Sequence, residues 1–188
     1  VANHLSKSAE LIKTLKSYET EDISKLMGLS SNLAFLNFER YQSWKKPTKP
    51  SADARQAVFA FQGDVYQGLE AATMKKGDLK FAQKHLRILS GLYGVLKPLD
   101  LMAPYRLEMG TKLATKKHDD LYGFWKDTLT ADINEQLAEQ KDSTLINLAS
   151  NEYFNALNKK DIAGDIVSPV FKDFKNGDYK IISFFAKK

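Results

Sequence analysis

The sequence predicts an α+β fold, a single compact domain in which several helices surround a mixed sheet. At 188 residues the chain has the length of one domain and can bury a substantial core. Amphipathic helical patterns and short apolar runs follow one another irregularly, which is typical of α+β proteins rather than of repeated strand–helix units. The chain also ends on a hairpin signal, the pair Asn176-Gly177, which predicts a C-terminal β-hairpin.

The N-terminal quarter of the chain predicts three helices and a loop. Residues 6–17 have their apolar side chains on one face, and Thr20 suits the N-cap of a second helix. A third helix is predicted over residues 31–44, with four core side chains at helical spacing: Leu33, Leu36, Tyr41 and Trp44. Residues 45–53 contain two prolines and three lysines and are the clearest loop.

Shorter elements are predicted further along the chain. The apolar run at residues 57–61 reads as a buried strand, and residues 66–69 as a helical turn. Residues 144–149 predict a strand, after which Ser150 caps a short helix. A longer amphipathic helix over residues 123–139 has apolar side chains four residues apart: Trp125, Leu129, Ile133 and Leu137.

The rest of the chain is organised around residues 85–110, an apolar stretch interrupted by two glycines and two prolines. Two interpretations of residues 78–102 are open. A helix starting at Asp78 could lead through Gly91 and Gly94 into a second helix, a helix-hairpin-helix element whose backbone N–H groups reach a nucleic-acid phosphate. Alternatively, residues 88–92 form a strand with the glycines at its exit.

Residues 104–110 alternate apolar and charged side chains, which predicts a short strand. Arg106 and Glu108 would then lie on the same side. They are either an exposed salt bridge of small energetic value or an anion ligand, Arg106, oriented by Glu108.

The positive charge of the chain is concentrated in one segment. Residues 75–118 contain ten Lys and Arg against three acidic residues, a net charge of +7, whereas the whole chain carries +5. Such a local field favours polyanions or small anions.

Several classes of chemistry find no support in the sequence. The absence of cysteine excludes disulfides and thiol nucleophiles and is compatible with a reducing cytoplasm. The three histidines have no metal-ligand spacing, so we expect no metal site and no cofactor. No motif identifies catalytic residues, and no apolar run is long enough to span a membrane.

Nucleic-acid binding, to double- or single-stranded DNA, explains the basic segment and its interleaved aromatics best. The alternative is an uncharacterised enzyme or small-anion-binding protein that uses the same Arg, Tyr and Glu cleft. The candidate residues for nucleic-acid or anion binding are Arg87, Ser90, Gly91, Tyr93, Gly94, Lys97, Tyr105, Arg106, Glu108, Lys180 and Lys187. Among them, Arg87, Lys97 and Arg106 are the predicted phosphate contacts, and Tyr93 or Tyr105 the stacking surface.

Four stretches of the sequence carry a resemblance to a known family: FQGDVYQGL at 61–69, LRILSGLYGVLKPLDLMAPYRLEMG at 86–110, INLASNEYF at 146–154 and KNGDYKIISFFAKK at 175–188. In this order they resemble the YaaA family of bacterial peroxide-stress resistance proteins. The resemblance extends from about residue 5 to the last residue.

This resemblance implies a cytoplasmic protein of the oxidative-stress response to hydrogen peroxide. The family is associated with limiting free intracellular iron and with protecting DNA. Because nothing in the sequence is typical of an iron-storage site, we expect any effect on iron to be indirect. Proteins of the family begin earlier and continue further, so we also expect that both ends are missing here.

Overall fold

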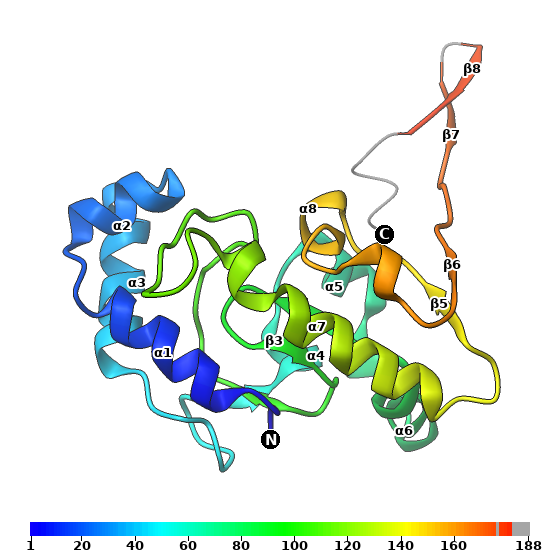
Figure 1. Ribbon diagram of the computed structural model, residues 1–188, viewed down its shortest axis with the longest axis horizontal. Helices are drawn as coiled ribbons and strands as arrows, with labels where there is room; N and C mark the ends of the chain where they lie inside the picture. Colours follow the sequence, from blue (N-terminus) through cyan, green and yellow to red (C-terminus); the bar gives the residue numbers. More distant parts are fainter. Residues whose placement is uncertain (176, 182–188) are drawn as a thin grey trace.

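The computed structural model describes residues 1–175 and 177–181 and confirms the α+β class (Figure 1). The predicted mixed sheet is replaced by four separate two-stranded sheets, in which β1 pairs with β4, β2 with β3, β5 with β6 and β7 with β8. Among the strands of the described residues, only the β5–β6 pair is parallel. The helices are α1 (Leu5–Leu15), α2 (Thr20–Met27), α3 (Ser31–Ser43), α4 (Ala57–Ala60), α5 (Asp64–Leu69), α6 (Lys76–His85), α7 (Leu121–Ala138) and α8 (Asn151–Phe154), with 3-10 turns η1 (Ala71–Thr73) and η2 (Lys159–Asp161). The strands are β1 (Arg55–Gln56), β2 (Ile88–Ser90), β3 (Gly94–Leu96), β4 (Leu101–Met102), β5 (Thr144–Ile146), β6 (Asp165–Val167), β7 (Asp173–Lys175) and β8 (Asp178–Lys180).

Helices α2 and α3 form a tight helical hairpin joined by Gly28, Leu29 and Ser30. Gly28 has φ +62°, the left-handed conformation that ends a helix most easily at glycine, and Leu29 is buried. The N-cap of α2 is Glu19 rather than the predicted Thr20, because Asp22 accepts a hydrogen bond from the Glu19 backbone N–H.

Helix α3 has the predicted bounds but buries a different face. Tyr41 is buried as predicted, whereas Leu33 and Leu36 are 41% and 39% exposed. The buried face is formed instead by Ala34 and Asn37 together with Tyr41. Helical spacing fits both faces, and the small Ala34 allows the neighbouring helix to approach closely.

The predicted strand at residues 57–61 is wrong, because these residues form the short helix α4. The backbone N–H groups of Ala57 and Val58 donate to the carbonyls of Asp100 and Pro98. These two N–H groups are therefore hydrogen-bonded to the turn at residues 98–100, and the β1–β4 pairing does not continue beyond Gln56. The predicted helical turn at residues 66–69 is confirmed as part of α5.

The helix predicted from Asp78 starts earlier and ends earlier than expected. Asp78 accepts from the Lys75 backbone N–H as the third residue of a capping box, and α6 stops at His85. Residues 88–96 then form an antiparallel hairpin with Ser90 opposite Gly94. The interpretation of residues 88–92 as a strand with glycines at its exit is confirmed. The helix-hairpin-helix interpretation of residues 78–102 is wrong, because the chain has no helix between His85 and Leu121.

The segment of residues 103–110 crosses the β2–β3 turn without joining a sheet, so the predicted strand is also wrong. Its alternation is nevertheless as expected: Leu107 and Met109 are buried, while Arg106 is exposed. A Cβ at Gly91 would collide with the backbone carbonyl of Leu107, so this crossing requires glycine.

Helix α7 confirms the predicted apolar face, because Trp125, Leu129, Ile133 and Leu137 are all buried. The indole N–H of Trp125 donates to the Gly91 carbonyl over 2.8 Å. Its ring lies so close to Gly94, at φ +75°, that a Cβ there would stand 2.7 Å from it. The chain has no helix, in the part that the structure describes, that is long and apolar enough to cross a membrane.

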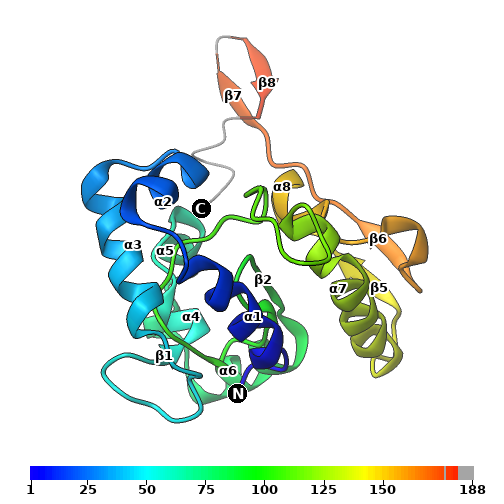
Figure 2. The same ribbon diagram turned by 60° about the vertical axis from the view of Figure 1, so that its left-hand side comes forward.

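The C-terminal hairpin of β7 and β8 is confirmed, and it is shorter than the flanking apolar runs suggested. Both views show it projecting away from the helical body (Figures 1 and 2).

Candidate functional site

Hydrogen bonds to the buried Ser90 hydroxyl link three of the predicted site residues. The hydroxyls of Ser90 and Tyr105 share a hydrogen bond of 2.5 Å, and Ser90 also accepts from the Tyr93 backbone N–H over 2.9 Å. The Tyr93 hydroxyl accepts from the Trp44 indole N–H and the Ala103 backbone N–H. Tyr93 is fully buried, so it supports Tyr105 from behind and offers no face for stacking.

Two further tyrosines, from distant parts of the chain, join Tyr105. Burial raises the pKa of Tyr105 well above its usual value, and the phenols of Tyr153, Tyr93 and Tyr66 add to the rise. Burial likewise raises the pKa of Tyr153 to about 12, with Glu152 and Glu108 contributing. The pKa of Tyr66 rises by burial and then by Tyr153. We call Tyr66, Tyr105 and Tyr153 the tyrosine cluster; all three phenols stay protonated at neutral pH and can donate hydrogen bonds.

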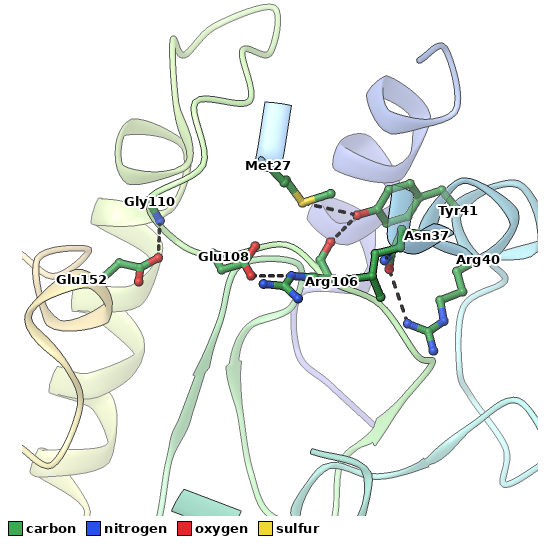
Figure 3. A network of polar contacts seen from close by, with 9 residues as sticks. Met27, Asn37, Arg40, Tyr41, Arg106, Glu108, Gly110 and Glu152 are labelled. Atoms are coloured by element: carbon green, nitrogen blue, oxygen red, sulfur yellow. Dashed lines mark hydrogen bonds and ion pairs between the residues drawn. The ribbon is translucent and has the colours of Figure 1, made fainter. Parts of the chain in front are cut away.

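Arg106 and Glu108 form the predicted pair next to this cluster. The Arg106 Nε donates to Glu108 Oε1 over 2.7 Å, and the side chains are 47% and 37% exposed. Figure 3 shows this pair between α3 on one side and Glu152 of α8 on the other. Glu152 accepts from the Gly110 backbone N–H over 2.9 Å, which holds α8 against this segment.

The α2–α3 hairpin holds residues 103–110, which we call the Arg106 segment, from the other side. The Tyr41 hydroxyl donates to the Arg106 carbonyl and lies 4.0 Å from the Met27 sulfur (Figure 3). Burial, ahead of the nearby Glu108, raises the Tyr41 pKa, so this donor keeps its proton. Arg40, one residue before Tyr41, donates to Asn37 over 3.5 Å.

Arg87 and Lys97 lie elsewhere. Together they line a small depression that contains three carboxylates, from Asp100, Asp132 and Glu135. Arg87 donates to the backbone carbonyls of Gln83 and Leu86, and its buried Nε has no hydrogen-bond partner. Burial lowers the pKa of Arg87, against the opposing charges of Glu139, Asp100 and Asp132. The predicted phosphate contacts are therefore divided between two places.

The remaining candidates are also dispersed. Gly91 and Gly94 are buried against Leu107 and Trp125, so their backbones approach the protein core. Lys180 lies on the projecting hairpin, 3.8 Å from Asp178. Lys187 lies outside the residues that the structure describes.

Sequence reasoning missed Phe61, Tyr66, Tyr153 and Arg40. The signal that points to three of them is their position inside stretches that carry the family resemblance, Phe61 and Tyr66 in residues 61–69 and Tyr153 in residues 146–154. Tyr105 lies in a third such stretch, residues 86–110. The structure brings these three stretches to one place. Among the described residues, no group of three or more His, Asp or Glu side chains is arranged to hold a metal ion.

The fold and this site define a helix-rich α+β protein in which the partly exposed Arg106–Glu108 pair lies near a group of partly buried tyrosines. A family model described as peroxide stress protein YaaA matches residues 2–188. The chain belongs to this family, and the resemblance seen in the sequence is confirmed.

Similar proteins occur in several bacteria, each named UPF0246 protein. The relative from Saccharophagus degradans is 56% identical over 184 residues, and those from Teredinibacter turnerae and Hahella chejuensis are each 55% identical over 184 residues. In each case the match covers 98% of this chain and 72% of the relative.

Proposed function

We propose that this protein acts in the peroxide-stress response by binding nucleic acid on the face formed by the α2–α3 hairpin and the Arg106 segment. The observation that carries the proposal is the contact of Tyr41 and Met27 with one another and of Tyr41 with the Arg106 carbonyl. This contact fixes the helical hairpin to the backbone of Arg106, whose guanidinium is exposed.

The α2–α3 hairpin supports the proposal because its geometry suits a phosphate. Its turn contains Gly28 in the left-handed conformation, and α3 begins directly after an extended Ser30. The first backbone N–H groups of a helix lack partners within that helix and attract anions. We therefore propose that the helix-hairpin-helix element lies at residues 20–43 instead of at the organising stretch.

Arg106 supplies the charge that this surface needs. Its guanidinium is about half exposed and uses Nε for Glu108, which leaves the two Nη groups for a phosphate. The partly buried Arg40 lies on the adjacent helix. The wider +7 segment adds long-range attraction.

Protection of DNA under peroxide would follow from such binding in the cytoplasm. An effect on free intracellular iron would then be indirect. We propose both as consequences of DNA binding by a single domain.

A second candidate function is binding, or chemistry, of a small anion at the tyrosine cluster. The observation that favours it is the position of Tyr153, which lies within electrostatic range both of the Arg106–Glu108 pair and of Tyr105. The Tyr105 hydroxyl is in turn linked to that of Ser90. Donors and a carboxylate set side by side suffice for anion binding and for some acid–base catalysis.

The test is DNA binding by fluorescence anisotropy over a salt series, with duplex and single-stranded oligonucleotides. Arg106→Ala should weaken binding about tenfold and reduce the salt slope by about one. Arg87→Ala is the matched control, since it removes the same charge from the depression that Arg87 shares with three carboxylates and should leave the slope unchanged.

Absence of binding at low salt would overturn the nucleic-acid proposal, and so would an equal loss in both variants. Calorimetry with inorganic phosphate separates the second candidate. Phosphate binding that needs Arg106, without DNA binding, would establish that candidate in its place.

A further inference from the structure

A group of four aromatic side chains next to Arg106 keeps part of its surface exposed. The group consists of Phe61, Tyr66, Tyr105 and Tyr153, which we call the ring group. Phe61 stacks on Tyr66 with ring centres 4.9 Å apart and planes 17° apart, and Phe61 meets Tyr105 edge-on at 6.4 Å. Tyr105 retains exposed surface although its hydroxyl end is buried. By contrast, Trp125, Tyr41 and Tyr93 are completely enclosed.

The ring group combines flat apolar faces with fixed hydrogen-bonding groups. The Tyr105 hydroxyl is held by Ser90, and the Tyr153 hydroxyl accepts a hydrogen bond from the Met109 backbone. Arg106 and Glu108, whose charges act on Tyr153, set a planar donor beside a planar acceptor. The site therefore offers faces for stacking and groups of both polarities at its rim.

A nucleobase has this same combination of a flat face and an edge of donors and acceptors. A phosphate group has no face to stack, so a phosphate site would not need four rings. In a duplex the base faces are stacked on their neighbours and cannot reach protein rings, whereas an unpaired base can.

We propose that the ring group binds one unpaired nucleobase, turned out of the strand, with the Arg106–Glu108 pair reading its edge. This inference rests on the proposed nucleic-acid binding and narrows it to strands that contain an unpaired base. The α2–α3 hairpin then holds the backbone, and the ring group holds the base.

The test compares a matched duplex with the same duplex carrying 2-aminopurine in a small unpaired bubble. The wild-type chain should bind the bubble about tenfold more tightly and quench its fluorescence, since stacking on a protein ring is worth this much per base. Tyr66→Leu and Phe61→Leu should each remove most of this preference while leaving the affinity for the matched duplex unchanged.

Phe81→Leu is the control variant. Phe81 is an aromatic residue of α6 that is 67% exposed and contacts His85 with ring centres 4.4 Å apart. It lies outside the ring group, so its removal should leave the preference intact. Circular dichroism checks that each variant is folded.

A measurement on the wild-type protein alone removes any dependence on variant folding. An abasic site in place of the unpaired 2-aminopurine keeps the phosphates and removes the ring. The preference over the matched duplex should then disappear.

The outcomes separate the two proposals. Absence of binding to any of the DNAs overturns the proposed function and this inference with it. Equal binding to bubble and duplex overturns this inference alone, as does a preference that survives the abasic site or both leucine variants.

Discussion

Arg87 and Arg106 belong to the same short basic stretch, yet the fold gives them opposite surroundings. Arg106 is about half exposed, faces one carboxylate and lies near Tyr153, whose phenol stays protonated at neutral pH. Arg87 donates to two backbone carbonyls, has a buried Nε and lies within the influence of three carboxylates. Arg106 can bind a ligand without losing its present contact, whereas the hydrogen bonds of Arg87 are already made within the protein.

The net positive charge of a sequence segment does not say how much of that charge is exposed to a ligand. Segment 75–118 has a net charge of +7, but part of that charge is neutralised by acids from α7, which is remote in sequence. Attraction to a polyanion depends on the charge that remains free at the surface.

The largest effect on stability is expected at Gly91, where the β2–β3 turn that follows Arg87 meets the segment that contains Arg106. Gly91→Ala should lower the free energy of unfolding by roughly 3 kcal/mol, because the new Cβ would collide with the Leu107 carbonyl. Urea denaturation measures this, with Gly77→Ala as control, since a Cβ at Gly77 would have no atom within 4 Å. A stable Gly91→Ala variant would show that the Arg106 segment does not cross the β2–β3 turn so closely.

Arg87 should contribute more than Arg106 to stability, and Arg106 should contribute more than Arg87 to DNA binding. Arg87→Ala should cost about 1 kcal/mol, since two hydrogen bonds to backbone carbonyls are lost. Arg106→Ala should cost less than about 0.5 kcal/mol, as is usual for exposed ion pairs. Thermal and urea unfolding measure both. If Arg106 proved the more important for stability, the distinction drawn between the regions would be wrong.

The smallest effect at neutral pH is expected in the tyrosine cluster, whose contribution changes only at alkaline pH. Burial raises the pKa of Tyr153 to about 12, so above pH 10 the folded state holds a proton that the unfolded state loses more readily. Stability from this group is therefore complete below about pH 10 and is lost as the pH rises towards 12.

Tyr153→Phe removes that titration, so its stability should fall less steeply than that of the wild type between about pH 10 and 12. At pH 8 the two proteins should differ only by the lost hydrogen bond from the Met109 backbone. Urea midpoints across this pH range provide the measurement. If the urea midpoints of the wild type and of Tyr153→Phe fell equally with rising pH, Tyr153 would not be enclosed by the cluster.

Much of the fold was predictable from local patterns. The apolar face of α7, the α2 and α3 positions and the β7–β8 hairpin each depend on residues close in sequence. The incorrect predictions concern apolar runs whose backbone hydrogen-bond partners are distant in sequence. One example is α4, whose first backbone N–H groups donate to carbonyls of the turn at residues 98–100. The wrong face of α3 has the same cause, because helical spacing alone does not say which side another helix covers.

The candidate site shows the same division. Ser90, Tyr105, Arg106 and Glu108 were predicted together because they belong to one stretch, and the structure keeps them together. Tyr66 and Tyr153 were not predicted, because only tertiary packing brings α5 and α8 to that stretch.

By itself the sequence determined the α+β class, the family and the chemistry of the groups that converge, because composition, periodicity and motifs are local properties. The tertiary structure decided which arginine is exposed, which tyrosines remain partly exposed and which glycine the Arg106 segment crosses. Burial and charge neutralisation depend on neighbours from distant segments, and these neighbours are set only when the chain is folded.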